Sequence, residues 1–272
     1  MPYTTTYTIH SFDNPQPTRT IEADVTSEQV NSLLTDGYLV RESLVSGELL
    51  EELRAAADEI ADANGAEVGA AQNSSRQFGG LFIRNLMDKH PTFLKLLKFE
   101  PTLSLARAVL GPQVQVHASV LRVTYPGQEK QETQWHFHQR VIPEPMPPWF
   151  GRPRVLDNLI YLDDLDDATG PFCVVPGSHT RLHDPLYGDD FSDKPDQVLL
   201  RIPAGSCVTA DAGLWHRGMA TRPDGKIRRL IILGYSPTWM KTVDRMGGGL
   251  TDSLRENADW ETRELLGIGG YY

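Results

Sequence analysis

The sequence predicts a mainly β protein, a sandwich or a jelly roll, with helices packed against it on the N-terminal side. Two observations support this fold class. Patterns with an apolar residue every three or four positions fill the first 110 residues, whereas from Val114 onward short apolar runs are separated by turns rich in Gly and Pro. Several short strands without intervening helices are typical of sandwiches and jelly rolls, and not of alternating βαβ units.

The N-terminal part begins with a polar arm and then becomes helical. Thr26 and Gln29 occupy the two ends of a capping box, and Gly37 supplies the stop signal of the helix that this box opens. The elements predicted here are, in order, an arm or short strand over residues 1–22, that first helix, a strand over 38–40, a helix over 48–64, a loop over 65–80 and a helical region over 91–110.

The rest of the chain is predicted to be built mostly from strands. They cover residues 114–123, 133–141, 155–162, 170–179, 197–202, 206–210 and 229–235, and residues 245–272 are expected to hold one amphipathic helix and a tail. We expect one domain over residues 1–272, with a mostly helical part over 1–112, a jelly-roll core over 113–240 and a C-terminal helix and tail over 241–272.

Composition and charge exclude several classes of protein. The net charge of −10 argues against a nucleic-acid partner, because binding to phosphates needs a basic face. No apolar run approaches the roughly 18 residues that span a bilayer, so we expect no membrane partner. The first residues lack the basic and apolar regions of a signal peptide, which predicts a cytoplasmic location.

Three histidines are candidates for a metal site. His136 and His138 lie two positions apart, so their side chains share a face if this run is a strand. His216 follows a Trp, as His136 does, and is the other histidine placed to join them. Neutral imidazole binds Fe, Zn, Cu and Ni. Histidines also pack in protein cores, so the spacing alone leaves a metal site and a structural role both open.

Several motifs appear in a fixed order between about Val25 and Tyr235. They are Asp36-Gly37-Tyr38, Trp135-His136, Leu162-Asp163-Asp164, Pro176-Gly177-Ser178-His179, and Trp215-His216-Arg217-Gly218 followed by Arg228. In this order they resemble the phytanoyl-CoA dioxygenase family of Fe(II)- and 2-oxoglutarate-dependent oxygenases. The resemblance implies a double-stranded β-helix (a jelly roll, cupin-like) wrapped by N-terminal helices.

The resemblance also implies the ligands of the iron and of the cosubstrate. Fe(II) would be bound by His136, by the residue two positions further on, which is His138, and by His216. An arginine about a dozen residues after the last ligand would hold the far carboxylate of 2-oxoglutarate. Arg228 fits that place, with Arg229 as the alternative, and strand alternation lets only one of them face inward.

Two further residues are candidates for contacts with the cosubstrate or the substrate. Gln134 shares the predicted face of His136 and His138, and Asn158 lies on the neighbouring predicted strand.

The chain departs from the family pattern at two positions. Gly218 stands where the family often has Ser, and His138 stands where it usually has Asp or Glu. Three neutral imidazoles leave Fe(II) with two positive charges before 2-oxoglutarate binds, instead of one. With His in place of Asp or Glu at position 138, two interpretations are possible. Either His138 is a different ligand of the same site, or the activity has been lost and His138 only packs against its neighbours. We predict a ligand, because position and face are those of the missing carboxylate.

The prediction is therefore an Fe(II)- and 2-oxoglutarate-dependent dioxygenase with His136, His138, His216 and Arg228 as its catalytic residues. With O₂ it would hydroxylate, desaturate or cyclise a small-molecule metabolite, and its oligomeric state is not predicted. Two alternatives stay open. One is a three-histidine metal dioxygenase that works without 2-oxoglutarate, and the other is a non-catalytic jelly roll that binds a metal or a small molecule.

Overall fold

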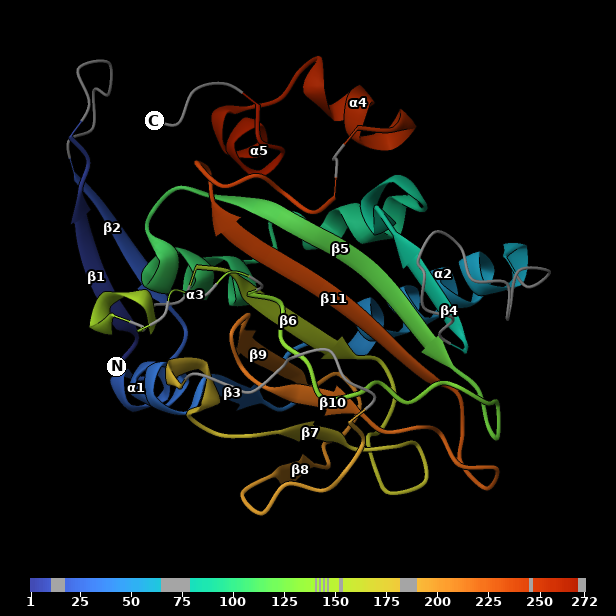
Figure 1. The fold of residues 1–272 in the computed structure, drawn as a ribbon. Coiled ribbons are helices and arrows are strands. Elements are labelled where there is room, and N and C mark those ends of the chain that lie inside the picture. The colour runs from blue at the N-terminus through green and yellow to red at the C-terminus, as the bar shows by residue number, and fades with distance from the viewer. Residues whose placement is uncertain are drawn as a thin grey trace.

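The computed structural model describes residues 1–10, 18–64, 79–139, 141, 143, 145, 147–151, 154–181, 190–244 and 247–268. Two antiparallel sheets face each other, and helices cover the outer side of the larger one (Figure 1). A separate two-stranded sheet stands at one side, where β1 (Tyr3–Thr8) pairs with β2 (Thr18–Ala23).

The larger sheet contains the long strands of the molecule. Its six strands follow the order β3-β9-β6-β11-β5-β4, and every neighbouring pair is antiparallel. The strands are β3 (Tyr38–Arg41), β4 (Leu81–Arg84), β5 (Val114–Thr124), β6 (Leu156–Tyr161), β9 (Cys207–Asp211) and β11 (Arg228–Pro237). The register between β11 and β5 shifts between Gly234 and Tyr235.

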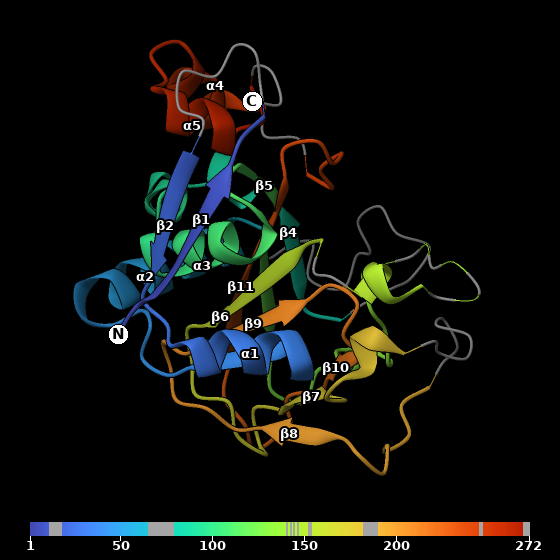
Figure 2. The same ribbon diagram turned by 90° about the vertical axis from the view of Figure 1, so that its left-hand side faces the viewer.

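The smaller sheet lies against the inner face of the larger one, in the lower part of Figure 1 and seen from the side in Figure 2. Its antiparallel strands, in the order β10-β7-β8, are β7 (Phe172–Val174), β8 (Val198–Leu200) and β10 (His216–Gly218). A buried cluster that includes Leu159, Tyr161, Phe172, Val174 and Leu230 joins the two inner faces. The inner faces of the two sheets are thus packed together by apolar side chains over part of their length.

Helices cover the outer face of the larger sheet. They are α2 (Gly47–Ala63), α3 (Glu100–Leu110) and the 3₁₀ helices η2 (Leu86–Asp88) and η3 (Pro91–Leu96). Leu53, Phe93 and Leu103 from these helices pack against Leu121 and Ile231 of the sheet. The remaining helical elements are α1 (Ser27–Asp36), η4 (Pro148–Gly151), η5 (Ser178–Thr180), α4 (Gly249–Arg255) and α5 (Trp260–Leu265). Each helix in the described ranges is too short or too polar to span a bilayer.

Most predicted elements are present, but some differ from the prediction. The capping box of Thr26 and the left-handed C-cap at Gly37 are confirmed. The helical region predicted over 91–110 is interrupted between η3 and α3, and α4 and α5 replace the one C-terminal helix that we expected. Strand β4, beside β5, was not predicted. Most of the loop predicted over 65–80 and the tail beyond residue 268 lie outside the described residues.

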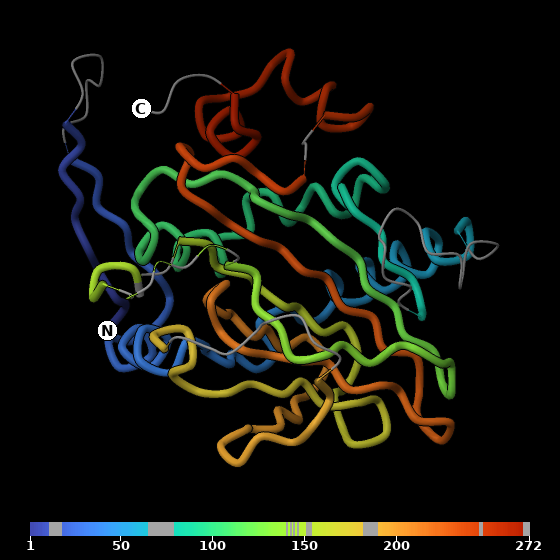
Figure 3. Tube along the Cα trace, viewed as in Figure 1, coloured from blue at the N-terminus to red at the C-terminus, as the bar shows by residue number. Residues whose placement is uncertain are grey.

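The histidine-bearing segment is the largest difference from the prediction. We expected a strand over 133–141, but in the described residues of this segment only His136 forms a bridge, with His216 of β10. Figure 3 shows the chain returning from the end of β5 to run beside β10. The backbone N–H groups of His138 and Gln139 both donate to the carbonyl of Ala212, at 2.7 and 2.9 Å. These bonds hold the segment close to the residues before β10 without continuous strand pairing.

Thr26→Ala is expected to lower the free energy of unfolding by about 1 kcal/mol, because the Thr26 hydroxyl accepts the Gln29 backbone N–H at 3.2 Å. Urea unfolding followed by far-UV circular dichroism measures the change. Thr35→Ala, at an exposed position of the same helix, is the control and should be neutral or slightly stabilising. An equal loss in both variants would show that the cap contributes nothing specific.

Candidate metal centre

Three imidazole rings from two distant segments meet at one end of the small sheet. The backbones of His136 and His216 exchange two hydrogen bonds, both of 3.0 Å, which sets the two residues directly opposite each other. The ring centroids lie 4.2 Å apart for His136 and His216, 5.4 Å for His136 and His138, and 4.9 Å for His138 and His216. One possible ligand atom from each ring lies within 4.8 Å of the other two.

Hydrogen bonds at Nδ1 determine which ring nitrogen of each histidine carries the proton. His136 Nδ1 lies 2.8 Å from the carbonyl oxygen of Gln134, and His216 Nδ1 lies 2.9 Å from that of Leu214. Since a carbonyl oxygen only accepts, Nδ1 is protonated in both rings, and Nε2 carries the lone pair. His138 Nδ1 makes the same kind of bond to Asp157 Oδ2, at 2.6 Å. All three rings therefore have the tautomer that ligates through Nε2.

This donor set fits a divalent transition metal. Burial lowers the pKa of His216 well below its usual value, and the neighbouring His136 and His138 lower it further, so His216 is neutral near pH 7. Bonds from imidazole to a metal are about 2.1 Å long, which puts two ligand nitrogens on one ion about 3 to 4 Å apart. The three candidate ligand atoms, one from each ring, all lie within 4.8 Å of one another, which is close to that spacing.

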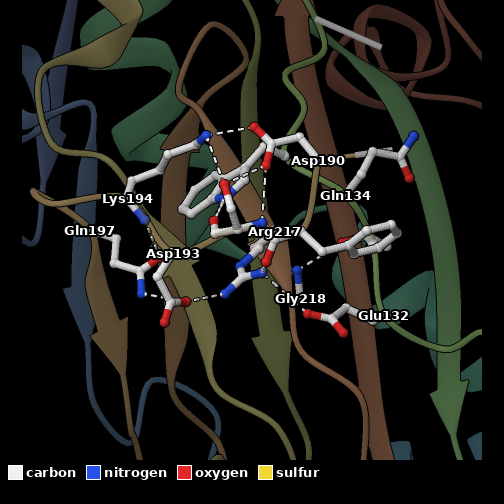
Figure 4. Close-up of polar contacts among 12 residues, drawn as sticks. Glu132, Gln134, Asp190, Asp193, Lys194, Gln197, Arg217 and Gly218 are labelled. Atoms are coloured by element: carbon white, nitrogen blue, oxygen red, sulfur yellow. Dashed lines mark hydrogen bonds and ion pairs between the residues drawn. The ribbon is translucent and has the colours of Figure 1, made fainter. Parts of the chain in front are cut away.

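The outer face of the small sheet supports the two histidine segments from behind. Trp135 Nε1 donates to the carbonyl of Ser192 at 2.8 Å, and the Arg217 guanidinium lies 5.3 Å from the centre of the Trp135 ring. Figure 4 shows Arg217 between Asp193 and Glu132, at 2.7 and 3.3 Å. Trp135 directly precedes His136, and Arg217 directly follows His216. These contacts therefore hold the backbone next to each of the two paired histidines.

Arg228 lies on the inner side of the larger sheet. It is two residues before Leu230, whose side chain belongs to the cluster between the sheets, and is 6% exposed. Its guanidinium donates to the carbonyl of Gly170, and no carboxylate among the described residues pairs with it. A Cβ atom on Gly218 would lie 4.0 Å from Arg228 Nη2, so the guanidinium sits beside the residue two positions after His216.

A buried cation without an anionic neighbour is unusual, because transfer of a charge out of water costs several kcal/mol unless it is paired. Burial lowers the pKa of the Arg228 guanidinium, and Tyr161 acts in the opposite direction. Arg229 has the opposite environment: it bonds to Asp163 at 2.7 Å and to Asp58 of α2 at 2.8 Å on the outer face. Of the two arginines considered from the sequence, Arg228 is the one that faces inward.

The two amide side chains predicted to contact the cosubstrate have different places. Gln134 is buried two residues before His136, and its backbone carbonyl oxygen, not its side chain, accepts the proton of the His136 ring. Asn158 lies on the opposite face of β6, where its side chain bonds to Thr209 at 2.8 Å and to the carbonyl of Leu233 at 3.1 Å. The structure therefore joins the Gln134 backbone to the His136 ring, and it leaves Asn158 on the helix-covered side of the sheet.

Asp157 is the residue near the cluster that the sequence did not single out. It precedes Asn158 on β6, and its carboxylate contacts the His138 ring. Asp211 lies across from Leu156 on β9, and burial raises the pKa of its carboxyl to about 6. Its Oδ1 accepts the Gly213 N–H at 2.6 Å, and in the described part of the chain no hydrogen bond joins it to the rings of His136, His138 or His216.

The chain matches known proteins over most of its length. Residues 33–230 match the model of the phytanoyl-CoA dioxygenase (PhyH) family. An ectoine dioxygenase of Sphingopyxis alaskensis is 29% identical over 246 residues, which are 88% of this chain and 76% of that protein. An ectoine dioxygenase of Bordetella parapertussis is 28% identical over 162 residues, 58% of this chain, and the match spans only 50% of that relative's length.

The fold has a solved counterpart. The non-heme alpha ketoglutarate dependent carbocyclase SnoK from nogalamycin biosynthesis aligns with a TM-score of 0.61 at 20% identity, over 84% of this chain and 95% of that one. At this identity the likeness concerns the fold alone, and it confirms the double-stranded β-helix with N-terminal helices predicted from the sequence.

Proposed function

Because this chain belongs to the phytanoyl-CoA dioxygenase family, we propose that it is a non-haem Fe(II)- and 2-oxoglutarate-dependent oxygenase that oxidises a small-molecule metabolite with O₂. The observation that carries the proposal is the pairing of two features on the inner side of the two sheets. Three imidazoles converge with their Nε2 lone pairs available for a metal, and a buried guanidinium without a carboxylate partner in the described chain lies beside Gly218, two residues after His216.

In the proposed site His136, His138 and His216 hold Fe(II) and leave coordination positions for 2-oxoglutarate and O₂. When bound, the iron and 2-oxoglutarate supply the oxidising chemistry, in which the keto acid is converted to succinate and CO₂. Arg228 binds the far carboxylate of 2-oxoglutarate through charge-assisted hydrogen bonds, since the Gly170 carbonyl occupies only part of its five donors. The burial of Arg228 strengthens that attraction, because little water screens it.

The names of the relatives suggest a first substrate for the proposed reaction. Both relatives described above are named ectoine dioxygenases, so ectoine is a rational first compound to test. Hydroxylation of a C–H bond is the expected outcome, with desaturation or ring closure as the other outcomes predicted from the sequence. We propose a cytoplasmic location, which cell fractionation with an antibody to the chain would test.

The deciding experiment measures succinate. The purified protein is loaded with Fe(II) under anaerobic conditions, mixed with 2-oxoglutarate and exposed to air with and without candidate substrates. We expect succinate formation that needs both Fe(II) and 2-oxoglutarate and that rises when the right substrate is present. Consumption of O₂ without succinate would instead favour the three-histidine dioxygenase that works without a keto acid. A protein that binds no transition metal would be the non-catalytic jelly roll.

A further inference from the structure

We propose that Asp157 is the positioning carboxylate of the metal centre: it holds the His138 ring with Nε2 toward the ion and supplies, through that ring, the negative charge that a carboxylate ligand would otherwise bring. The inference rests on the proposed function, because it assigns a role at the same site. It concerns a residue that does not itself touch the metal.

The first support is the contact between the two side chains. His138 Nδ1 and Asp157 Oδ2 are 2.6 Å apart, and the carboxylate is 8% exposed while the imidazole is 39% exposed. His138 lies outside the paired strands, and its backbone is held by a bond to the Ala212 carbonyl. His136 and His216, in contrast, are fixed by their mutual bridge and by their own backbone acceptors. The orientation of the His138 ring therefore depends on Asp157 more than on the backbone.

The second support is the space that the sheet leaves for this carboxylate. Asp157 of β6 lies directly across from Gly234 of β11, at the position where β11 shifts its register with β5. A Cβ atom at Gly234 would come within 2.8 Å of Asp157 Oδ1. A side chain at this position would thus push the carboxylate out of place, and glycine leaves it room to face His138.

The third support is electrostatic. Three neutral imidazoles bring no charge to a divalent ion, whereas the family's usual set includes one carboxylate. A carboxylate that accepts a ligand's N–H raises the basicity of that ligand and fixes its tautomer. In the described part of the chain, His138 is the one side chain that hydrogen-bonds to Asp157. The negative charge absent from position 138 is thereby present one hydrogen bond further from the ion.

The test compares metal binding in whole-protein variants without O₂ or 2-oxoglutarate. Ni(II) affinity is measured by competition with a chelator for the wild type, Asp157→Ala and Asp157→Asn. We expect Asp157→Ala to weaken Ni(II) binding by about 10- to 100-fold, and Asp157→Asn by a smaller factor, since its amide oxygen still accepts the ring proton. Asp211→Asn is the matched control, because Asp211 is also buried (3% exposed, against 6% for Asp157) but bonds to a backbone N–H, and this variant should bind Ni(II) like the wild type.

A second readout separates positioning from a general loss of structure. In the Co(II)-loaded protein the Nδ1 protons of the three ligand rings give exchangeable, strongly shifted proton NMR signals. We expect three such signals in the wild type and two in Asp157→Ala, because the exposed Nδ1 proton of His138 then exchanges with water. A uniform weakening of all three signals would overturn the inference.

The outcomes distinguish this inference from the proposed function. A wild-type protein that binds neither Ni(II) nor Co(II) would refute the metal centre itself. A wild-type protein that binds both, with unchanged affinity in Asp157→Ala and Asp157→Asn, would leave the metal centre standing and refute the role of Asp157.

Discussion

Arg228→Ala is expected to raise the KM for 2-oxoglutarate about 100-fold or more. The wild-type guanidinium is buried, has no carboxylate partner in the described chain and lies beside Gly218, so the far carboxylate of 2-oxoglutarate is the proposed partner of its charge. Hydrogen bonds to charged groups each contribute about 1.5 to 3 kcal/mol, and two of them correspond to at least about 100-fold in affinity. Succinate formation as a function of 2-oxoglutarate concentration gives the KM.

Neighbouring variants make this prediction specific. Arg228→Lys should recover only part of the affinity, because an ammonium group cannot bind a carboxylate through two parallel bonds. Arg229→Ala is the matched control: Arg229 is bonded to Asp163 and Asp58 on the outer face, so its loss should leave the KM for 2-oxoglutarate unchanged. Ni(II) affinity without 2-oxoglutarate should be the same in all three variants. A wild-type KM in Arg228→Ala would refute the assigned role.

His138→Ala is expected to lower the affinity for the metal by more than about 100-fold, which is a larger loss than that expected for Asp157→Ala. The reason is that His138→Ala removes a proposed ligand, whereas Asp157→Ala removes only the group that positions it. The ring lies 5.4 Å from that of His136 and 4.9 Å from that of His216, centre to centre, and its Nδ1 is bonded to Asp157. Metal content after purification and Ni(II) titration both measure the effect.

Restoring the family's usual ligand provides the complementary result. His138→Asp should bind Fe(II) better than His138→Ala, because a carboxylate at this position can ligate the same ion. The new carboxylate would face the carboxylate of Asp157, and the two negative charges would repel each other. The double variant His138→Asp/Asp157→Asn should therefore bind Fe(II) better than His138→Asp alone. His10→Ala, at an exposed position, is the control and should not change metal content. Full metal content in His138→Ala would show that this histidine is a bystander.

Much of the fold could be predicted from local patterns. The change from helical spacing to short strands near Val114 predicted the helix-covered sheets, and the capping box at Thr26 set the start of α1. The His-x-His spacing and the second Trp-His pair identified the three histidines that meet in the structure. These features depend on neighbours in the chain, so their physical causes are visible in the sequence.

The faces of the central strands were decided by the tertiary structure alone. Alternation along a strand shows that Asp157 and Asn158, or Arg228 and Arg229, point to opposite sides, but it does not show which side is which. Every residue of β6 is buried, since one face meets the helices and the other the small sheet, and so no alternation of polar and apolar residues marks the inner face.

The sequence by itself determined the fold class, the family and the three histidines, because periodicity and the order of the motifs can both be followed along the chain. Only the tertiary structure decided that Arg229 is engaged by Asp163 while Arg228 faces inward. It likewise placed Asp157, and not Asn158, against His138. The reason is that each of these contacts joins segments far apart in the chain, and the packing of two sheets and a helical layer selects the side to which each residue turns.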